Sequence, residues 1–301
     1  MPINYSIIIP HKDIPELLVR CIKSIPERDD VQVIVVDDNS ADAESYKSMY
    51  PELNRPNLEL YLTKEGRGAG YARNCGLKKV KGRWIIFADA DDFFLPEWIN
   101  LTDQYLDSEA DVIQFKIDDV ISHSDCKWHN RALDNYFNGI GTSRDVLFSD
   151  ITCWAKMLKA NFIQKKYLSF DEIKCAEDVG FGFHLAVEAD KIIVSQSAIY
   201  DLTYRDGSQT TIVNKEYAWI RYGVLQKTYT YAANNGFQRY ELPYVIEVLK
   251  TWRKLGLSDF FWFIWHERSE IVRASIVQID NKPFNYRHPY LYVLLVLFKM
   301  I

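Results

Sequence analysis

Residues 84–92 read Trp84-Ile85-Ile86-Phe87-Ala88-Asp89-Ala90-Asp91-Asp92. The apolar run 84–88 is typical of a buried strand, and the carboxylates of residues 89–92 follow it directly. Carboxylates beyond the carboxyl end of a strand suggest a binding site, because open α/β sheets bind ligands there. Like charges this close repel, so we expect Mg²⁺ or Mn²⁺, with phosphate oxygens completing its shell, to offset them. Taken alone, the stretch would fit a solvated acidic turn better.

Apolar runs alternate with amphipathic helices through the first half of the chain. The predicted strands are 7–9, 31–36, 58–62, 84–88 and 112–115, and the helices between them are 14–25 and about 71–80. Alternation of strand and helix is typical of a mostly parallel sheet covered on both faces. The predicted fold class is therefore α/β, with a mostly parallel central sheet flanked by helices.

Composition narrows the function classes. The chain has 301 residues, 48% of them hydrophobic and 26% charged, as in an ordinary globular protein. A net charge of −5 without a long Lys/Arg run argues against nucleic-acid binding. Five scattered cysteines without a CxxC pair indicate reduced thiols, and residues 1–9 lack a secretory signal pattern. The expected location is cytoplasmic.

The last third of the sequence is predicted to be helical. We expect an α/β domain over residues 1–215 and a helical region over 216–301, with helices at 217–233, 242–255 and 260–279. The apolar run 289–301 is shorter than the roughly 20 residues that span a bilayer. It fits peripheral contact with the inner face of the membrane, a terminal helix on its own domain, or a homodimer contact. The patch 260–265 is open to the same interpretations.

Three predicted strand ends carry polar residues: Pro10-His11, Asp37-Asp38-Asn39-Ser40 and Asp89–Asp92. In a parallel sheet these ends share one rim. One carboxylate, such as Asp38, can accept a hydrogen bond from a uracil imide N–H, and another can accept one from a ribose hydroxyl. A third can hold a metal on a diphosphate. The combination predicts a nucleotide-sugar site, although residues 37–40 also suit a helix N-cap.

The ordered set of motifs resembles glycosyltransferase family 2, inverting enzymes with the GT-A fold, of the polysaccharide, capsule and O-antigen type. The resemblance covers about residues 4–213 and rests on six segments: Ser6–Pro10, Val33–Ser40, Gly70–Gly76, Phe87–Asp92 followed by Pro96, Trp154–Lys156, and Glu177-Asp178. Each segment is weak by itself, and their order makes the signal specific. The helical tail adds nothing to it.

The resemblance implies roles on the donor side. Asp38 matches the carboxylate that recognises the base, and Pro10 lies at the same nucleotide subsite. Asp91 matches the direct ligand of a divalent metal, Mn²⁺ or Mg²⁺, while Asp89 faces the ribose or the metal's waters. Arg73 and Asn74 match nucleotide-side positions. Arg73 could equally be an internal clamp on the carboxylates of residues 89–92.

On the acceptor side, the resemblance makes Asp178 the general base, with Glu177 as the alternative or as a residue that orients the acceptor. An acceptor hydroxyl is a poor nucleophile until a carboxylate takes its proton. Without the resemblance, an exposed acidic pair at the start of a helix would be preferred. Trp154 matches an aromatic near the acceptor sugar, though a lone Trp is more often core. Arg205 matches a group that stabilises the diphosphate.

These expectations define an enzyme that moves a hexosyl or N-acetylhexosaminyl group from a nucleotide sugar to a hydroxyl of a glycan or lipid-linked glycan. Among nucleotide sugars, a UDP-sugar is the favoured donor. Two rivals remain at this stage. One is a non-catalytic subunit that binds nucleotide sugars. The other is an Asp-x-Asp phosphohydrolase, which would want Thr or Val where this chain has Phe93.

Overall fold

The computed structural model describes residues 1–118, 127–203, 212–237 and 242–267. The chain divides into two compact units, Met1–Ser208 and Gln209–Ile301, each with its own packing.

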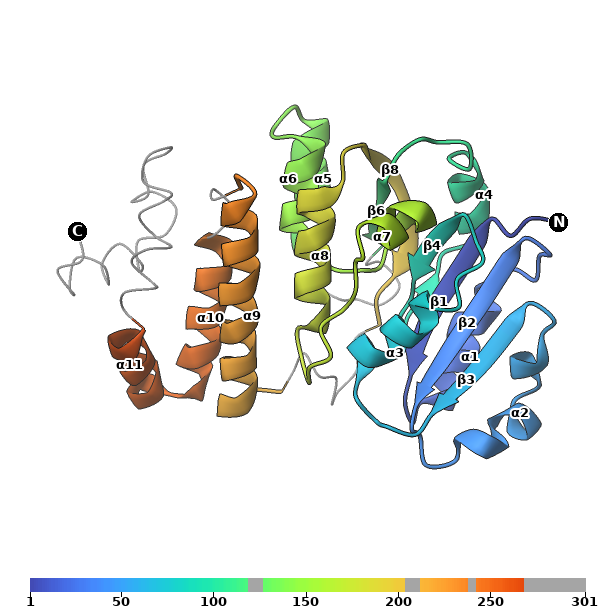
Figure 1. Cartoon of the computed structure of the whole chain (residues 1–301), viewed down its shortest axis with the longest axis horizontal. Coiled ribbons are helices and arrows are strands. Elements are labelled where there is room, and N and C mark those ends of the chain that lie inside the picture. The colour runs from blue at the N-terminus through green and yellow to red at the C-terminus, as the bar shows by residue number, and fades with distance from the viewer. Residues whose placement is uncertain (119–126, 204–211, 238–241, 268–301) are drawn as a thin grey trace. The chain divides into compact units, whose positions relative to one another are not determined.

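The described part of the first unit contains one eight-stranded sheet in the order β3-β2-β1-β4-β7-β6-β8-β5 (Figure 1). Its strands are β1 (Tyr5–His11), β2 (Val31–Asp38), β3 (Leu58–Thr63), β4 (Trp84–Phe87), β5 (Phe93–Phe94), β6 (Val112–Asp118), β7 (Lys156–Lys159) and β8 (Ile192–Asp201). The first four run parallel, and β7 and β5 are antiparallel to their neighbours. The predicted mostly parallel α/β sheet is confirmed.

The apolar composition of the central strands explains their position. Every residue of β1 and β2 is buried, which requires cover on both faces of the sheet. The helices of this unit are α1 (Pro15–Lys23), α2 (Tyr46–Met49), α3 (Ala69–Leu77), α4 (Trp98–Asp103), α5 (Lys127–Phe137), α6 (Ser143–Ser149), α7 (Ala160–Lys165) and α8 (Glu177–Glu188). Of these, α3 packs on β1 and β2 and also contacts α8 (Figure 1).

Sequence patterns located the first half of the sheet better than the second. All five predicted strands exist, the fifth continuing to Asp118 instead of ending at Phe115. The strands β5, β7 and β8 were not predicted. Two of them are only two and four residues long, too short for a period of two to be visible.

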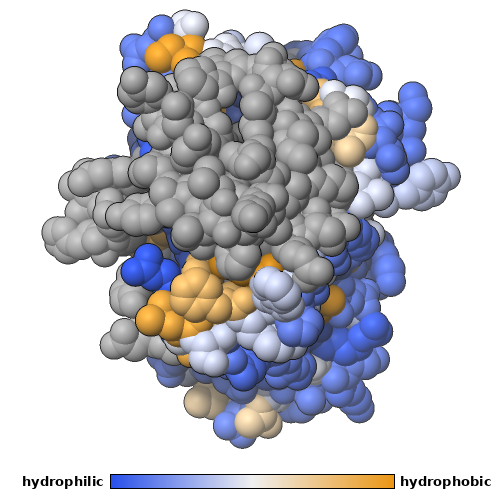
Figure 2. Space-filling model, turned by 90° about the vertical axis from the view of Figure 1, so that its left-hand side faces the viewer, coloured by the Kyte–Doolittle hydropathy of each residue, from blue (hydrophilic) through white to orange (hydrophobic). Residues whose placement is uncertain are grey.

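The second unit contains α9 (Lys215–Asn234), α10 (Leu242–Leu255) and α11 (Leu257–His266). Trp252 stacks on Phe263 with ring centroids 4.4 Å apart, and both side chains are buried. The third helix begins three residues before the predicted Phe260, and the predicted end at Ile279 lies outside the described residues. On α11, Leu257, Phe261, Trp262 and Trp265 are exposed, and Figure 2 shows hydrophobic side chains gathered on one face of the molecule.

Within the described ranges, no helix is long and apolar enough to cross a bilayer. The run 289–301, proposed from the sequence as a membrane, core or dimer segment, lies outside those ranges.

Candidate functional site

The carboxyl ends of β2, β1 and β4 meet at one edge of the sheet. His11 at the end of β1 pairs with Asp37 in β2, and Ile8 pairs with Phe87 at the end of β4. Because these strands are parallel, the polar residues that follow them emerge at the same edge. The structure therefore confirms that the three predicted strand ends share one rim, which we call the carboxyl edge.

The first polar pair at the carboxyl edge is structural. His11 donates from Nδ1 to Asp37 Oδ2 at 2.8 Å, while its Nε2 accepts the Ile14 backbone N–H at 3.2 Å. These two partners fix the neutral tautomer of the imidazole. Ser40 donates to Asp37 from its backbone N–H and its hydroxyl, at 2.8 and 2.6 Å. Burial would raise the pKa of Asp37, but the hydrogen bonds from His11 and Ser40 hold it below its ordinary value.

Asp38 lies beside this pair and holds the start of α3. Its two carboxylate oxygens accept the backbone N–H groups of Arg67 and Gly68 at 2.9 and 2.7 Å. The loop can present both donors because Gly68 has φ +94°, a conformation that other residues rarely adopt. A carboxylate has about four acceptor positions, so capacity for a ligand remains. The nucleotide role of Asp38 stays a prediction.

The turn 89–92 follows β4 directly. Asp89 is about a third exposed, with 30% of its side-chain surface accessible, and Asp91 is partly buried. Asp92 is buried and accepts the Tyr200 hydroxyl at 3.0 Å and the Thr203 backbone N–H at 2.7 Å. Burial raises the pKa of Asp92, and the neighbouring charges of Asp89 and Asp91 add to the effect. Asp89 and Asp91 are thus partly accessible to solvent, whereas the Asp92 carboxylate faces the interior.

Arg73 joins the donor-side and acceptor-side carboxylates. From α3, its Nη2 contacts Asp89 Oδ1 at 2.6 Å and its Nη1 contacts Glu177 Oε1 at 2.9 Å. The guanidinium also lies over the ring of Phe170, 5.2 Å from the centroid. Burial would lower the pKa of Arg73, but the surrounding acidic groups hold it well above its ordinary value. Of the two sequence interpretations, the contacts match an internal clamp, and contact with a nucleotide stays a prediction.

The rest of α3 lies close against the segment before α8. Asn74 donates to the Phe170 carbonyl at 3.0 Å and accepts the Phe170 N–H at 2.9 Å. A Cβ on Gly70 would lie 2.2 Å from the Asp171 carbonyl oxygen, so the backbones approach there more closely than any other residue would allow. The side-chain amide of Asn74 thus ties this segment to α3, and its nucleotide-side role stays a prediction.

Glu177 and Asp178 begin α8. The preceding residue, Ala176, has φ +58°, an unfavourable left-handed conformation for alanine. Burial raises the pKa of Asp178 to about 7, with the Glu177 charge adding to the rise and Arg73 opposing it. Among the described residues, no side chain donates a hydrogen bond to the Asp178 carboxylate. A carboxylate that exchanges its proton near neutral pH suits general-base chemistry.

The described residues contain no group of three or more His, Cys, Asp or Glu side chains arranged to hold a metal ion. Mg²⁺ commonly takes only one or two protein carboxylates and completes its shell with substrate phosphates and water. Asp91, with Asp89 two residues away in the same turn, provides such a donor set at the carboxyl edge. The residues therefore fit a metal that arrives with a diphosphate.

The remaining predicted site residues lie in three different settings. Pro10 is buried in β1, beside Val36 of β2 at the carboxyl edge. Trp154 is 7% exposed and packs near-parallel to Tyr200, with centroids 5.9 Å apart. That environment matches the core alternative for Trp154, and contact with an acceptor sugar stays a prediction. Arg205 lies outside the described residues.

Two residues of this site were missed from the sequence. Tyr200 in β8 contacts the acidic turn through its hydroxyl, and Arg20 in α1 donates to the Asp91 carbonyl oxygen and, at 2.7 Å, to Thr203 Oγ1. No local pattern marks either residue. Arg20 lies 71 residues from Asp91 in sequence, so only the assembled sheet brings them together.

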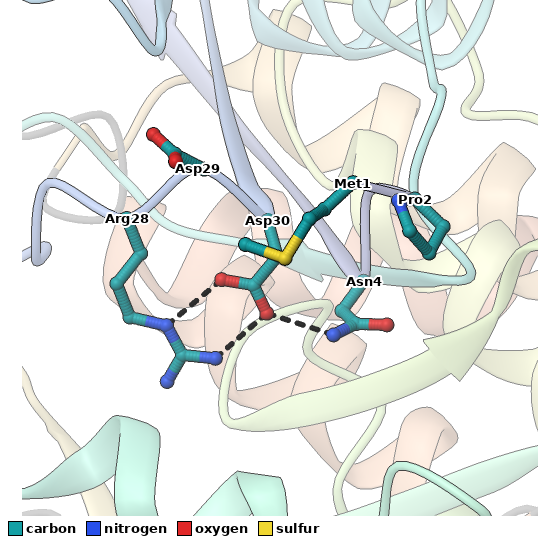
Figure 3. A pocket seen from close by; sticks show the side chains of 6 residues that line it. All are labelled: Met1, Pro2, Asn4, Arg28, Asp29 and Asp30. Carbon is teal, nitrogen blue, oxygen red and sulfur yellow. Dashed lines mark hydrogen bonds and ion pairs between the residues drawn. The ribbon is translucent and has the colours of Figure 1, made fainter.

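A pocket lies at the opposite edge of the sheet. Met1, Pro2, Asn4, Arg28, Asp29 and Asp30 line it, and Figure 3 shows Arg28 and Asn4 both bonded to Asp30. This edge holds the amino ends of β1 and β2. Ligands of open α/β sheets bind at the other edge, so the carboxyl edge remains the candidate site.

Known proteins resemble this chain in sequence and in fold. Residues 6–165 match the profile of glycosyl transferase family 2. Glycosyltransferase GlyA of Streptococcus pneumoniae is 24% identical over 84% of this chain and 39% of its own length. Poly(ribitol-phosphate) beta-glucosyltransferase of Bacillus spizizenii is 27% identical over 69% of this chain and 33% of its own. The chain thus spans between a third and two fifths of these curated relatives.

Solved structures show the same fold. Staphylococcus aureus TarS 1–349 in complex with UDP-GlcNAc has a TM-score of 0.62 at 17% identity, covering 93% of this chain and 89% of that one. The Pyrobaculum calidifontis mannosyltransferase PcManGT, in complex with GDP-Man and Mn²⁺, has a TM-score of 0.54 at 13% identity, covering 99% and 88%. The sheet, its mostly parallel order and these neighbours identify the predicted GT-A fold. With the profile matching more than half of its residues, the chain belongs to glycosyl transferase family 2.

Proposed function

We propose that this protein transfers a sugar from a nucleotide-sugar donor to a hydroxyl of a glycan or lipid-linked glycan, with inversion at the anomeric carbon. One observation carries the proposal: Arg73 holds Asp89 and Glu177 within 2.6 and 2.9 Å of a single guanidinium. The carboxylates assigned to donor and acceptor therefore border one site. A transferase needs that arrangement, because both substrates must meet in line.

The donor is proposed to be a UDP-sugar bound along the carboxyl edge. Asp38 would accept the uracil imide N–H with an acceptor position that the loop leaves open, beside Pro10. Asp89 would accept a ribose hydroxyl or a metal-bound water. The TarS neighbour crystallised with UDP-GlcNAc supports a uridine nucleotide, and the named relatives support a glucosyl or N-acetylglucosaminyl group.

A divalent metal is proposed to accompany the diphosphate at Asp91, with Asp89 in support. When bound, Mn²⁺ or Mg²⁺ supplies charge neutralisation on the departing diphosphate. The Mn²⁺ in the PcManGT neighbour supports this choice. Arg205, outside the described residues, is proposed to add positive charge at the same leaving group.

On the acceptor side, Asp178 is proposed to be the general base. Its carboxylate accepts the proton of the acceptor hydroxyl while that oxygen forms a bond to the anomeric carbon. The bond from that carbon to the diphosphate breaks, and its electron pair leaves with the diphosphate oxygen. One displacement from the opposite face inverts the configuration. Glu177, held by Arg73, orients the start of α8, and Trp154 is the proposed acceptor-side aromatic.

The acceptor is proposed to be a polymer of the bacterial surface. Two relatives are named as poly(ribitol-phosphate) transferases, and two others are named as teichoic acid biosynthesis proteins. A polyol-phosphate chain offers the hydroxyl groups that Asp178 would deprotonate. Such an acceptor extends the original expectation of a glycan or lipid-linked glycan.

A donor panel tests the proposal. Purified full-length protein is screened by thermal shift against UDP-, GDP-, dTDP- and CMP-sugars with and without Mn²⁺, and transfer is then measured with polyol-phosphate and glycan acceptors. A binding ligand raises the melting temperature. Stabilisation by UDP-sugars that requires Mn²⁺, followed by transfer, supports the proposal. Binding without transfer across the acceptor panel favours the non-catalytic rival, and release of phosphate from phosphomonoesters favours the phosphohydrolase.

Three variants separate the two halves of the site. Asp91→Asn should lose metal-dependent donor binding, whereas Asp178→Asn should bind donor normally and lose transfer. Asp107→Asn is the matched control, because Asp107 is a fully exposed carboxylate paired with Arg83. Full transfer by Asp178→Asn would move the base to Glu177.

The helical unit is proposed to be a separate domain from about residue 216, with peripheral membrane or homodimer contact through its end. Deleting residues 289–301 should release the protein from anionic liposomes if they bind the membrane. Retained liposome binding with a change from dimer to monomer would favour the dimer contact.

A further inference from the structure

A buried tyrosine, Tyr200, forms hydrogen bonds with the interior side of the turn that carries Asp89 and Asp91. Tyr200 accepts the Asp89 backbone N–H at 2.8 Å and donates its own hydroxyl hydrogen to Asp92 Oδ2 at 3.0 Å. One oxygen thus contacts both the first and the last acid of the turn. Within the turn, the Asp92 N–H donates to the Asp89 carbonyl at 3.1 Å.

Asp92 acts here as an anchor and not as a metal ligand. Both of its oxygens are engaged on the interior side, one by Tyr200 and the other by the Thr203 N–H at 2.7 Å. The Asp91 carbonyl is in turn held by Arg20. With these groups fixed, the side chains of Asp89 and Asp91 are the members of the turn that remain partly exposed at the carboxyl edge.

The Tyr200 ring is itself immobilised. It is fully buried, lies near-parallel to Trp154 at 5.9 Å, and meets the edge of Phe94 at 5.3 Å.

The side chains behind Trp154 are also fixed. Trp154 contacts the His129 ring at 4.9 Å, and His129 lies 3.1 Å from Asp150, which is paired with Lys156 at 2.9 Å. These polar side chains are buried together, so the residues that pack behind Trp154 and Tyr200 have little room to move. Trp154 and Lys156, singled out in the sequence, thus contribute to the support of the acidic turn.

We propose that Tyr200 is the positioning residue of the acidic turn, whose hydroxyl sets the direction in which Asp91 and Asp89 face the donor diphosphate and its metal. The ligand named here rests on the proposed function, whereas the mechanical role does not. Groups that orient metal ligands without touching the metal commonly change metal affinity by about 10-fold to 100-fold when removed.

The test is Tyr200→Phe, compared with Tyr5→Phe as the matched control. Tyr5 is also fully buried and donates its hydroxyl to a carboxylate, Asp103, at 2.9 Å, but from the opposite end of the sheet. Both variants lose the hydrogen bond that a buried tyrosine donates to a carboxylate, and Tyr200→Phe also loses the one that its oxygen accepts from the Asp89 N–H. A general loss of stability therefore affects both, and only a positioning role separates them.

The first measurement is amide hydrogen exchange of the peptide containing residues 88–92 in the ligand-free protein. The Asp89 amide should exchange at least about tenfold faster in Tyr200→Phe than in wild type and in Tyr5→Phe, because the variant lacks the hydroxyl oxygen that accepts its hydrogen bond. Unchanged exchange would overturn the proposal. Asp92→Asn serves as a second variant and should change exchange in the same direction, because its single side-chain oxygen cannot replace both the acceptor of the Tyr200 hydroxyl and that of the Thr203 N–H.

The second measurement is the Mn²⁺ concentration that half-saturates UDP binding by calorimetry. It should rise between about 10-fold and 100-fold in Tyr200→Phe, with kcat at saturating Mn²⁺ within about threefold of wild type. An equal rise in Tyr5→Phe would contradict a positioning role. If wild type binds no nucleotide, the proposed function fails, and hydrogen exchange still decides the role of Tyr200.

Discussion

The pH dependence of transfer should report the environment of Asp178. A pKa near 7 instead of 3.8 means that the site favours the protonated carboxyl by about 4 kcal/mol, at roughly 1.4 kcal/mol per unit. The base must be ionised to take a proton. We therefore expect kcat/KM to rise tenfold per pH unit below about pH 7 and to level off above it.

Replacing Glu177 by Gln tests the physical origin of this value. Burial is the largest cause of the raised pKa, the Glu177 charge is the next, and Arg73 opposes both. Without the Glu177 charge, the positive charge of Arg73 acts on Asp178 and on its remaining ion-pair partner, Asp89. The acid limb of the profile should move to lower pH, by on the order of one unit. Removing the opposing cation, in Arg73→Met, should move the limb to higher pH.

The assay is initial-rate transfer of labelled sugar from about pH 5 to about pH 9 at saturating metal, with kcat and KM separated at each pH. Donor binding by calorimetry at the same pH values serves as the control for loss of substrate affinity. An acid limb that stays in place or moves upward in Glu177→Gln would refute the reasoning. So would an Asp178→Asn variant that keeps the wild-type limb.

Three further predictions concern stability. The folded-state pKa of Asp178 is raised, so its ionisation destabilises the fold as pH rises from about 4 to about 7. In urea titrations, Asp178→Asn should therefore be more stable than wild type by roughly 1–3 kcal/mol at pH 8 and nearly equal to it at pH 4. Gly70→Ala should lose roughly 1–3 kcal/mol by the same method, because its Cβ would meet the Asp171 carbonyl; a variant as stable as wild type would contradict that close approach. Lys156→Met should cost about 3–5 kcal/mol by removing the ammonium group that pairs with the buried Asp150 Oδ2, and adding Asp150→Asn should recover part of the loss, which no simple packing defect would show.

The donor half of the site was largely visible in the sequence. Short apolar strands ending in acids are local patterns, and parallel pairing brings their ends together without further information. The clamp formed by Arg73 was one of two alternatives that the sequence left open. The contact of Arg73 with Glu177, 104 residues away, is one that no local pattern indicates.

The support behind the acidic turn could not be predicted in this way. Tyr200 is the last residue but one of β8, a strand that alternates only partly, and its partner Asp89 is 111 residues distant. The family resemblance also marked Trp154 as a candidate for sugar contact, and a sequence motif does not show which face of an indole is covered. Burial and stacking are properties of the assembled core.

The shared guanidinium of Arg73 has a consequence for protein engineering. Donor and acceptor specificity in this chain cannot be exchanged as independent modules, because one side chain from α3 contacts carboxylates from both halves. A chimera that joins residues 1–118 to the later half of a relative would need an acid opposite Arg73 and a backbone that tolerates the approach at Gly70. Grafts that keep residues 69–77 and 170–178 from the same parent should therefore fold and transfer better than grafts that divide them.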